Sequence, residues 1–225
     1  AKYAEADPDK FKHTLDWGLR LSLLIGAPAT VGLIMLAGPL LSAIFQYGDF
    51  DAEDVHMAQL ALIAYSVGLL GFMYVKVLSP GYFARQNTKT PMKIAIISMV
   101  AKIIVTLVLV LSMLHFSYEA PHVGLALATA LSALFQSWLL YRGLVKDGIY
   151  TPDPGWFLYL LKIGLACTVM GVVLYYGVED VFLWAKWSVY QRAFNILLWV
   201  GAGVGVYLLV LLITGVKIKE LIKHG

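Results

Sequence analysis

Long apolar stretches dominate the chain, and short polar segments separate them. Six stretches reach roughly 20 residues or more, which is the length of helix that crosses the hydrocarbon core of a bilayer. Such runs favour helices over the strands of a membrane barrel, in which apolar and polar residues alternate over about ten residues. We therefore predict an all-α integral membrane protein, a polytopic bundle of six transmembrane helices at about 15–45, 57–78, 92–114, 123–145, 156–178 and 193–214.

The first stretch is longer than a bilayer requires, and it contains Pro28 and Pro39. Because proline removes a backbone hydrogen bond, we predict a kink or tilt there, with the last turns leaving the membrane. The chain begins with Ala, and residues 1–13 lack the apolar core of a signal peptide. We therefore expect the chain to begin partway through a longer protein.

Composition supports a lipid environment. Of the 225 residues, 60% are hydrophobic and 14% are charged, whereas a soluble domain has about 25% charged residues. The net charge of +3 is small and the basic residues are not clustered, so nucleic-acid binding has little support. The single cysteine, Cys167, lies in an apolar run, which excludes a disulfide framework and a thiolate metal site.

Basic residues predict the orientation, because Lys and Arg are enriched in cytoplasmic connections. With the amino terminus inside, the inner segments hold Lys2, Lys10, Lys12, Arg20, Arg85, Lys89, Lys93, Arg142, Lys146, Lys217, Lys219 and Lys223. The outer loops hold two basic residues, Lys186 and Arg192, and the acidic residues Asp49, Asp51, Glu53, Asp54, Glu119, Glu179 and Asp180. This bias predicts that both termini are cytoplasmic.

The polar segment SPGYFARQNTKTPMK (79–93) is then a cytoplasmic hairpin between the second and third spans. Pro80-Gly81 is expected to stop the second helix, and Pro91 suits the first turn of the third, where a missing N–H costs nothing. The basic residues of the hairpin either set the topology or meet anionic headgroups, and we favour topology.

Ionisable residues inside a span are costly and become functional candidates. Lys102 lies near the middle of the third span, and Ser98 and Thr106 lie four residues to either side on the same helix face. A second polar stripe on the fourth span consists of Thr129, Ser132 and Gln136. Together the stripes predict a solvated cavity in which Lys102 attracts an anionic headgroup. The alternative is that Lys102 snorkels to an interface and the hydroxyls join helices.

Other polar and small residues suggest simpler roles. Arg20, Lys76 and Lys162 lie near inner ends of spans, and we expect them to snorkel toward headgroups. Gly201 and Gly205 are typical of close helix packing. The aromatic segment EDVFLWAKWSVYQR (179–192) predicts either an interfacial segment or an aromatic belt.

Motifs for reaction chemistry are absent from the sequence. It contains no G-x-x-x-x-G-K-[ST] phosphate loop, no H-E-x-x-H, no G-x-S-x-G, and no acidic pair within a span that would hold Mg²⁺. We therefore predict a transporter or channel rather than an enzyme, with no cofactor and no metal site.

Several segments carry a family resemblance: TLDWGLRLSLL (14–24), IFQYGDF (44–50), ALIAYSVGLLG (61–71), VKVLSPGYFARQNTKTPMKIAI (75–96), GIYTPDPGW (148–156) and the closing GVKIKELIKHG. Together they resemble the MurJ (MviN) family, the lipid II flippases of bacterial peptidoglycan synthesis, in the multidrug/oligosaccharidyl-lipid/polysaccharide exporter (MOP) superfamily. The hairpin residues that match the family motif are Pro80, Gly81, Arg85, Gln86, Lys89, Pro91 and Lys93.

The resemblance implies an architecture. Family members have fourteen membrane helices with cytoplasmic termini, and this chain is similar to the carboxyl-terminal six. Residues 1–146 would then supply the last four helices of the second transporter lobe. Residues 147–225 would supply two additional helices, which form a groove for the lipid tail, and a cytoplasmic tail.

The resemblance also implies a substrate and a location. The substrate would be lipid II, undecaprenyl-pyrophosphate carrying a disaccharide-pentapeptide, moved to the outer leaflet of the bacterial inner membrane by alternating access. Membrane potential rather than ATP would drive it, and the partners would be membrane lipids and the missing amino-terminal helices. The headgroup-binding arginines are expected before this chain. A sodium site is not expected, since Thr106 and Val110 stand where some members have Asn and Asp.

Alternatives from other classes stay open at this point. The chain could belong to a flippase for another polyprenyl-linked oligosaccharide, or to a non-transporting scaffold. A membrane enzyme acting on polyprenyl phosphates would need clustered acidic residues at the cytoplasmic face. Only Asp147 and Asp153 lie near each other there, and turn chemistry explains both more simply.

Overall fold

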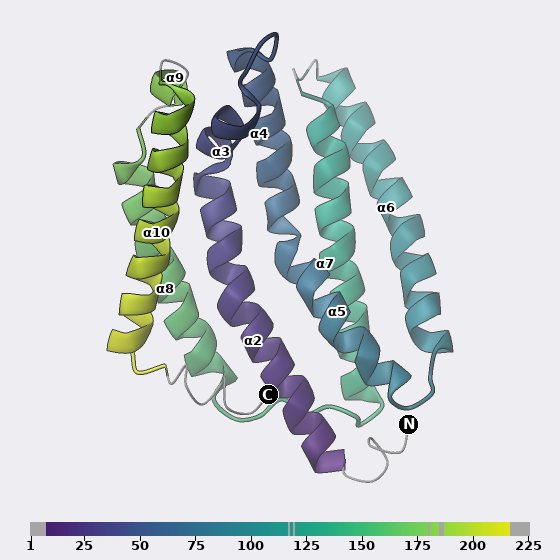
Figure 1. Cartoon of the computed structure of the whole chain (residues 1–225). Coiled ribbons are helices and arrows are strands. Elements are labelled where there is room, and N and C mark those ends of the chain that lie inside the picture. The colour runs from purple at the N-terminus through teal and green to yellow at the C-terminus, as the bar shows by residue number, and fades with distance from the viewer. Residues whose placement is uncertain (1–7, 117, 119, 180, 185–186, 217–225) are drawn as a thin grey trace. The chain divides into compact units, whose positions relative to one another are not determined.

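The structure is a computed structural model that describes residues 8–116, 118, 120–179, 181–184 and 187–216. The described residues are helical and contain no strand. The helices are α2 (Pro8–Met35), α3 (Ala37–Phe45), α4 (Ala52–Val67), α5 (Leu69–Phe83), α6 (Lys89–His115), α7 (His122–Lys146), α8 (Trp156–Gly177), α9 (Val181–Trp184) and α10 (Val189–Ile213) (Figure 1).

Six helical segments in the described part of the chain are long and apolar enough to cross a membrane. They are Lys10–Met35, Ala52–Phe83, Lys89–His115, His122–Lys146, Trp156–Gly177 and Val189–Ile213. The prediction of six helical spans is therefore confirmed, with boundaries within a few residues except at the first span, where α3 is a separate helix.

The helices form two compact units. Of the described residues, unit 1 contains 8–26 and 67–156, and unit 2 contains 27–66 and 157–216. The chain therefore crosses between the units within α2, next to the junction of α4 and α5, and directly after Trp156. The functional division at residues 146 and 147, which rests on the family resemblance, stays a prediction.

The predicted kink in the first span lies at Leu36, between α2 and α3. Pro28 lies inside α2, and the helix continues through it. Pro39 is the third residue of α3, and a proline can neither bond the carbonyl four residues earlier nor avoid clashing with it. That carbonyl belongs to Met35, so Pro39 accounts for the position at which α2 ends.

The second span is two helices rather than one, and they meet at Gly68. Gly68 and Gly71 pack directly on the backbone of α7. A Cβ added at Gly68 would lie 2.5 Å from the Cα of Ala130, and one at Gly71 would lie 2.6 Å from the backbone N of Leu134. Only glycine allows α5 and α7 to approach this closely.

The expectation that Pro80-Gly81 stops the second helix was wrong, because α5 continues to Phe83. Tyr82 in its last turn is fully buried, and its hydroxyl donates a hydrogen bond to the Leu140 carbonyl at 2.9 Å. This tertiary contact stabilises the last turn of α5 although Pro80 locally favours an end of the helix. After Phe83 the chain leaves the helix through a turn in which Gln86 has a φ of 58°, in the left-handed region.

The start of α6 agrees with its prediction. Pro91 is the third residue of the helix, in the first turn, and it is buried. The Asn87 side chain caps the helix, since its Oδ1 accepts a hydrogen bond from the backbone N–H of Thr90 at 3.1 Å.

The inner core of unit 1 brings four helices together near one end. It consists of Leu15, Leu19, Leu78, Tyr82, Ile94, Leu140, Leu144 and Tyr150. The basic residues predicted to be cytoplasmic in α2, in the hairpin and at the end of α7 are sequence neighbours of these core residues. They therefore share one end of unit 1, and the cytoplasmic orientation of that end stays a prediction.

Helix α6 is the most exposed of the six spans. It packs beside α7 (Figure 1) through a narrow buried face that includes Pro91, Ile94 and Ser98. The rest of its circumference, from Met92 to Leu114, presents large exposed apolar side chains. That surface is suited to lipid or to further helices.

In unit 2, α8 and α10 pack against each other at two glycines that the sequence analysis did not single out. Gly177 lies against the ring of Trp199, and Gly203 lies against Leu174. The expected packing at Gly201 and Gly205 was wrong for the described residues, since no atom lies within 4 Å of a Cβ added at either position. The two glycines face another side of α10 than the one that meets α8.

Candidate functional site

The first polar stripe lies where the sequence placed it, on α6. Lys102 is half-buried and stands halfway between the first and last residues of α6. Ser98 is almost completely buried, at 1% exposure, and Thr106 is half-buried. The three residues share the edge of α6 that turns toward α7, away from the broad apolar face.

Two hydroxyl groups of this stripe have no hydrogen-bond partner within the described part of the chain, Ser98 Oγ and Thr106 Oγ1. Buried hydroxyls are nearly always paired, and one left alone costs about 1–3 kcal/mol. The two atoms lie one helical turn to either side of Lys102. The stripe therefore has unused hydrogen-bonding capacity on both sides of its cation.

The second stripe meets the first through one hydrogen bond. Ser132 on α7 donates from Oγ to the Ser98 carbonyl oxygen at 2.9 Å. Thr129 donates to its own helix, at the Leu125 carbonyl (2.8 Å), and Gln136 is half-buried. We call the six residues Ser98, Lys102, Thr106, Thr129, Ser132 and Gln136 the polar seam.

The register of the two helices places the members of the seam relative to one another. Ser98 lies opposite Ser132, and Leu109 lies against Gly124. The helices are therefore antiparallel, and Lys102 lies level with residues 128–131 of α7. Among the described residues, Lys102 has no ion pair and no side-chain hydrogen bond.

The hairpin residues of the family motif divide into two groups. Gly81 and Pro91 are buried and shape the turn. The others are exposed, and among the described residues no ion pair forms with the three basic ones; they are Pro80, Arg85, Gln86, Lys89 and Lys93. Both roles considered for the basic residues, topology and headgroup contact, stay predictions.

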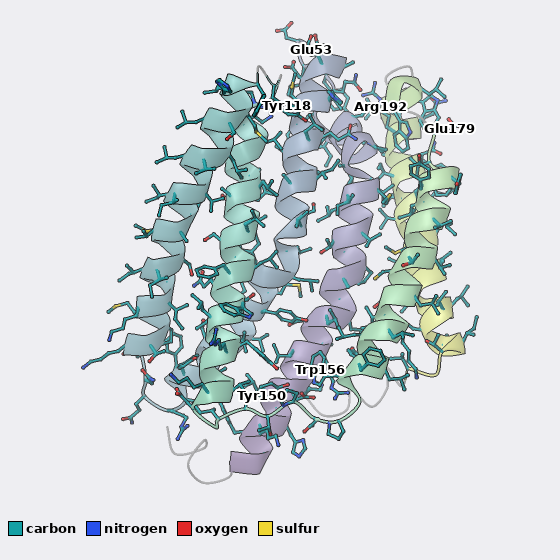
Figure 2. All side chains as sticks on the ribbon, turned by 180° about the vertical axis from the view of Figure 1, so that it is seen from behind. Glu53, Tyr118, Tyr150, Trp156, Glu179 and Arg192 are labelled. Carbon is teal, nitrogen blue, oxygen red and sulfur yellow. The ribbon has the colours of Figure 1, made fainter. Side chains whose placement is uncertain are left out.

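A buried carboxylate that the sequence analysis overlooked lies on α2. Asp16 is 3% exposed. Its Oδ2 accepts a hydrogen bond from Arg20 Nε at 2.7 Å. Its Oδ1 accepts one from Trp156 Nε1 at 2.7 Å and one from the Tyr150 hydroxyl. Tyr150 lies in the connection from α7 to α8, and Trp156 is the first residue of α8; the two lie close together (Figure 2).

This cluster adds contacts that the sequence did not predict for Arg20. The side chain pairs with Asp16 and its guanidinium lies over the Trp156 ring, 5.2 Å from the centroid. Whether Arg20 also reaches toward headgroups stays a prediction. An Asp and an Arg four residues apart in an apolar run is the local signal that could have indicated the pair. The contribution of Tyr150 and Trp156 was not readable locally, since they are 134 and 140 residues away.

The carboxylate also fixes the protonation of its phenol partner. Burial and the hydrogen bond to Asp16 raise the pKa of Tyr150 above its usual value. The phenol therefore remains a neutral donor at any physiological pH, and its hydrogen bond to Asp16 persists.

Unit 2 contains a second buried charge, Arg192 in the first turn of α10 (Figure 2). The sequence analysis placed Arg192 in an outer loop, and this was wrong. The residue belongs to α10 and its side chain is 7% exposed. Its Nη1 donates to the carbonyls of Ser42 (2.9 Å) and Gln46 (3.0 Å), and its Nε donates to that of Trp187 (3.1 Å). Arg192 thus caps the carboxyl end of α3.

The aromatic segment at 179–192 is partly inward-facing. Trp184 in α9 is fully buried, and its Nε1 donates to the Glu179 carbonyl at 3.2 Å. Tyr190 on α10 is highly exposed, as an interfacial residue or a belt residue would be. Lys2, Lys186, Lys217, Lys219, Lys223, Glu119 and Asp180 lie outside the described residues, as does the side chain of Phe182.

No group of three or more His, Cys, Asp or Glu side chains in the described part of the chain is arranged to hold a metal ion. Asp153, one of the two acidic residues predicted to lie near the cytoplasmic face, contacts His13 at 3.2 Å. Asp147 ends α7.

Comparison with known proteins gives a consistent result. The family described as lipid II flippase MurJ matches residues 1–197. A probable lipid II flippase MurJ of Vibrio cholerae is 41% identical over 98% of this chain, and one of Haemophilus influenzae is 39% identical over 94%. The lipid II flippase MurJ of Burkholderia cenocepacia is 40% identical over 76% of the chain.

The fold agrees with the sequence matches. A solved structure of lipid II flippase MurJ in an inward closed conformation superposes on 98% of this chain with a TM-score of 0.73 and 26% identity. The chain spans 41% of the Vibrio cholerae relative, 40% of the Haemophilus influenzae relative and 42% of the solved chain. It is therefore similar to a part of these longer proteins.

Proposed function

The chain belongs to the MurJ family of lipid II flippases, and from this membership we propose that it forms the carboxyl-terminal six-helix part of such a flippase. The chain is a multi-pass bacterial membrane protein segment. The complete transporter moves undecaprenyl-pyrophosphate-linked disaccharide-pentapeptide from the inner to the outer leaflet of the inner membrane. Both termini are cytoplasmic, and the partners are lipid II, membrane lipids and the amino-terminal helices that the relatives possess.

The observation that carries this proposal is the agreement of two comparisons over nearly the same residues. The family match covers residues 1–197, and the fold match covers 98% of the chain. The second candidate, transport of another polyprenyl-linked oligosaccharide, has no observation in its favour.

The polar seam forms a binding site for the anionic headgroup during transport. Support comes from the position of Lys102 at the middle of α6, from its lack of an ionic partner among the described residues, and from the unpaired hydroxyls of Ser98 and Thr106. Hydroxyl donors and an ammonium group are suited to phosphate oxygens. A cation without a partner at this depth is costly, which favours a role in which an anion visits it.

The energy source follows from the charge of the substrate. An inside-negative potential drives an anion outward, and each elementary charge contributes about 2.3 kcal/mol per 100 mV. That amount biases the direction of an alternating-access cycle without ATP. The two additional helices, α8 and α10, hold the lipid tail.

The proposal is tested with a chimera. The region of the Vibrio cholerae relative that matches this chain is replaced by the chain, and the chimera is expressed in a strain depleted of its own lipid II flippase. We expect growth and outer-leaflet lipid II to be restored, the latter measured with an externally added enzyme that degrades lipid II. A chimera present in the membrane at the level of the intact relative, yet unable to restore either, would contradict the proposal.

A further inference from the structure

We infer that Asp16 is the positioning residue of a latch that holds the start of α8 on α2. The latch consists of Asp16 and Arg20 on α2, Tyr150 in the connection between α7 and α8, and Trp156 at the first position of α8. All four residues belong to unit 1. Neither substrate nor metal is needed for any of these contacts.

The chemistry of the latch is that of a fully matched buried charge. A carboxylate removed from water loses most of its solvation free energy, and only close donors offset that loss. Asp16 has a charged donor on Oδ2 and two neutral donors on Oδ1. The two neutral donors are Tyr150, within the connection, and Trp156, directly after it. They reach Asp16 only when the connection lies against α2, so the buried charge of Asp16 is stable only in that arrangement.

The connection is shaped to deliver these donors. Gly148 and Gly155 have φ values of 66° and 96°, a region that favours glycine, and they bracket the segment at its two ends. The backbone N–H groups of Ile149 and Tyr150 donate to the Leu144 carbonyl at 3.0 and 3.1 Å. The chain therefore folds back on the end of α7 and inserts Tyr150, which is 1% exposed, into the inner core.

A second contact between the same two elements is weak and serves as a natural control. His13 Nδ1 and Asp153 Oδ2 are 3.2 Å apart, and the His13 side chain is 69% exposed. An exposed pair of this kind contributes little, because water and salt screen it. It joins α2 to the same connection as the latch does, at almost the same place in the chain.

The role of the latch rests on the proposed function. The chain passes from unit 1 to unit 2 directly after Trp156, and Trp156 is the first residue of α8, a helix proposed to hold the lipid tail. The latch fixes the point from which that helix starts. Loss of the latch should therefore impair translocation by releasing the connection that leads into α8, while the proposed headgroup site on α6 and α7 stays intact.

The first test is a measurement of loop order that needs no transport. In the purified chimera, hydrogen exchange is followed by mass spectrometry in Asp16→Asn and in the control Asp153→Asn. We expect faster exchange of residues 147–156 in Asp16→Asn alone, with α6 and α7 unchanged. Exchange of the connection that is the same in both variants, or that rises everywhere in Asp16→Asn, would overturn the inference.

The second test asks whether restraint alone restores function. In a Cys167→Ala background, the thiols introduced by His13→Cys and Asp153→Cys are joined by a short cross-linker, with and without Asp16→Asn. We expect Asp16→Asn to lower outer-leaflet lipid II about tenfold, the effect of about 1.4 kcal/mol, and the cross-link to restore most of it.

A cross-linked Asp16→Asn chimera that stays inactive, although its connection is again protected from exchange, would overturn the positioning role. Failure of the unmodified chimera to transport would instead count against the proposed function. Its exchange pattern would still report on the latch.

Discussion

Two charged residues of unit 1 lie in helical segments that are long and apolar enough to cross a membrane, and their surroundings are opposite. Asp16 accepts hydrogen bonds from Arg20, Tyr150 and Trp156, so its charge is completely matched. Lys102 has no ionic partner among the described residues, and the nearest polar groups on its stripe, the hydroxyls of Ser98 and Thr106, are themselves unpaired. The charge of Asp16 is neutralised by contacts within the protein, whereas the charge of Lys102 is available to a ligand.

The difference teaches how to assign buried charges in a transporter. Any ionisable residue in a span is a functional candidate by default, because its insertion is costly. A fully matched charge offsets that cost within the protein and acts on structure. An unmatched charge leaves its desolvation free energy without compensation until a ligand of opposite charge binds. Its removal should therefore affect function more than stability.

Arg192 in unit 2 belongs with Asp16 in this comparison. Its guanidinium donates to three backbone carbonyls and lies 5.8 Å from the centroid of the Tyr47 ring. Since its donors are directed into the protein, we assign it to the packing of α10 on α3 rather than to a substrate.

The largest expected effect is that of Asp16→Ala on stability. The change leaves the Arg20 charge and two buried donors without their acceptor, which should cost about 3–5 kcal/mol of unfolding free energy. Equilibrium unfolding of the purified chimera in detergent measures it. A loss no greater than that of Asp153→Asn would contradict the assignment of Asp16 to the stability of the fold.

Tyr150→Phe should have the next largest effect. It removes one hydrogen bond to a charged group, for a loss of about 1.5–3 kcal/mol. The raised pKa of Tyr150 means that the folded protein holds this proton more tightly than the unfolded chain does. The stabilisation is therefore fully present below pH about 10 and is lost as the pH rises above it.

The measurement is unfolding free energy against pH for both proteins. The gap between wild type and Tyr150→Phe should be constant from pH 7 to about 9 and should narrow above about 10. A gap that does not change with pH would show that the phenol proton is not shared with Asp16.

Lys102→Met should show the reverse pattern. We expect outer-leaflet lipid II to fall about tenfold, equivalent to about 1.4 kcal/mol, while the unfolding free energy is unchanged or slightly higher, because an unpaired cation is removed. Lys76→Met, at an exposed lysine of α5, is the matched control. Equal transport by both variants would exclude the proposed headgroup site.

The smallest expected effect is that of Asp153→Asn. Its partner His13 is exposed, so the loss of unfolding free energy should be below about 1 kcal/mol and should vanish at high salt. Unfolding at low and high ionic strength checks this. A salt-independent loss as large as that of Tyr150→Phe would place the Asp153 pair inside the latch.

The sequence predicted the membrane spans well because the signal is local. Hydropathy over about 20 residues is enough to identify a span, and Pro39 was enough to indicate a kink. The termination of α5 could not be predicted in this way, since Tyr82 packs in a core supplied by α2, α6 and α7 and holds the helix beyond Pro80.

The candidate site was predictable only in part. The spacing of Ser98, Lys102 and Thr106 predicted one helix face, and the structure confirms that they share it and that Ser132 reaches it. The spacing carried no information on which hydroxyls would be satisfied. The substrate role of the seam stays a prediction.

By itself the sequence determined the solvent of this protein, its six crossings and its family, because each depends on residues close together in the chain or on their order. The tertiary structure alone decided which charges are matched. Tyr150 and Trp156 reach Asp16 across 134 and 140 positions, and Arg192 reaches Ser42 across 150. Desolvation makes every buried charge costly, and only the folded arrangement supplies the donors and acceptors that offset the cost.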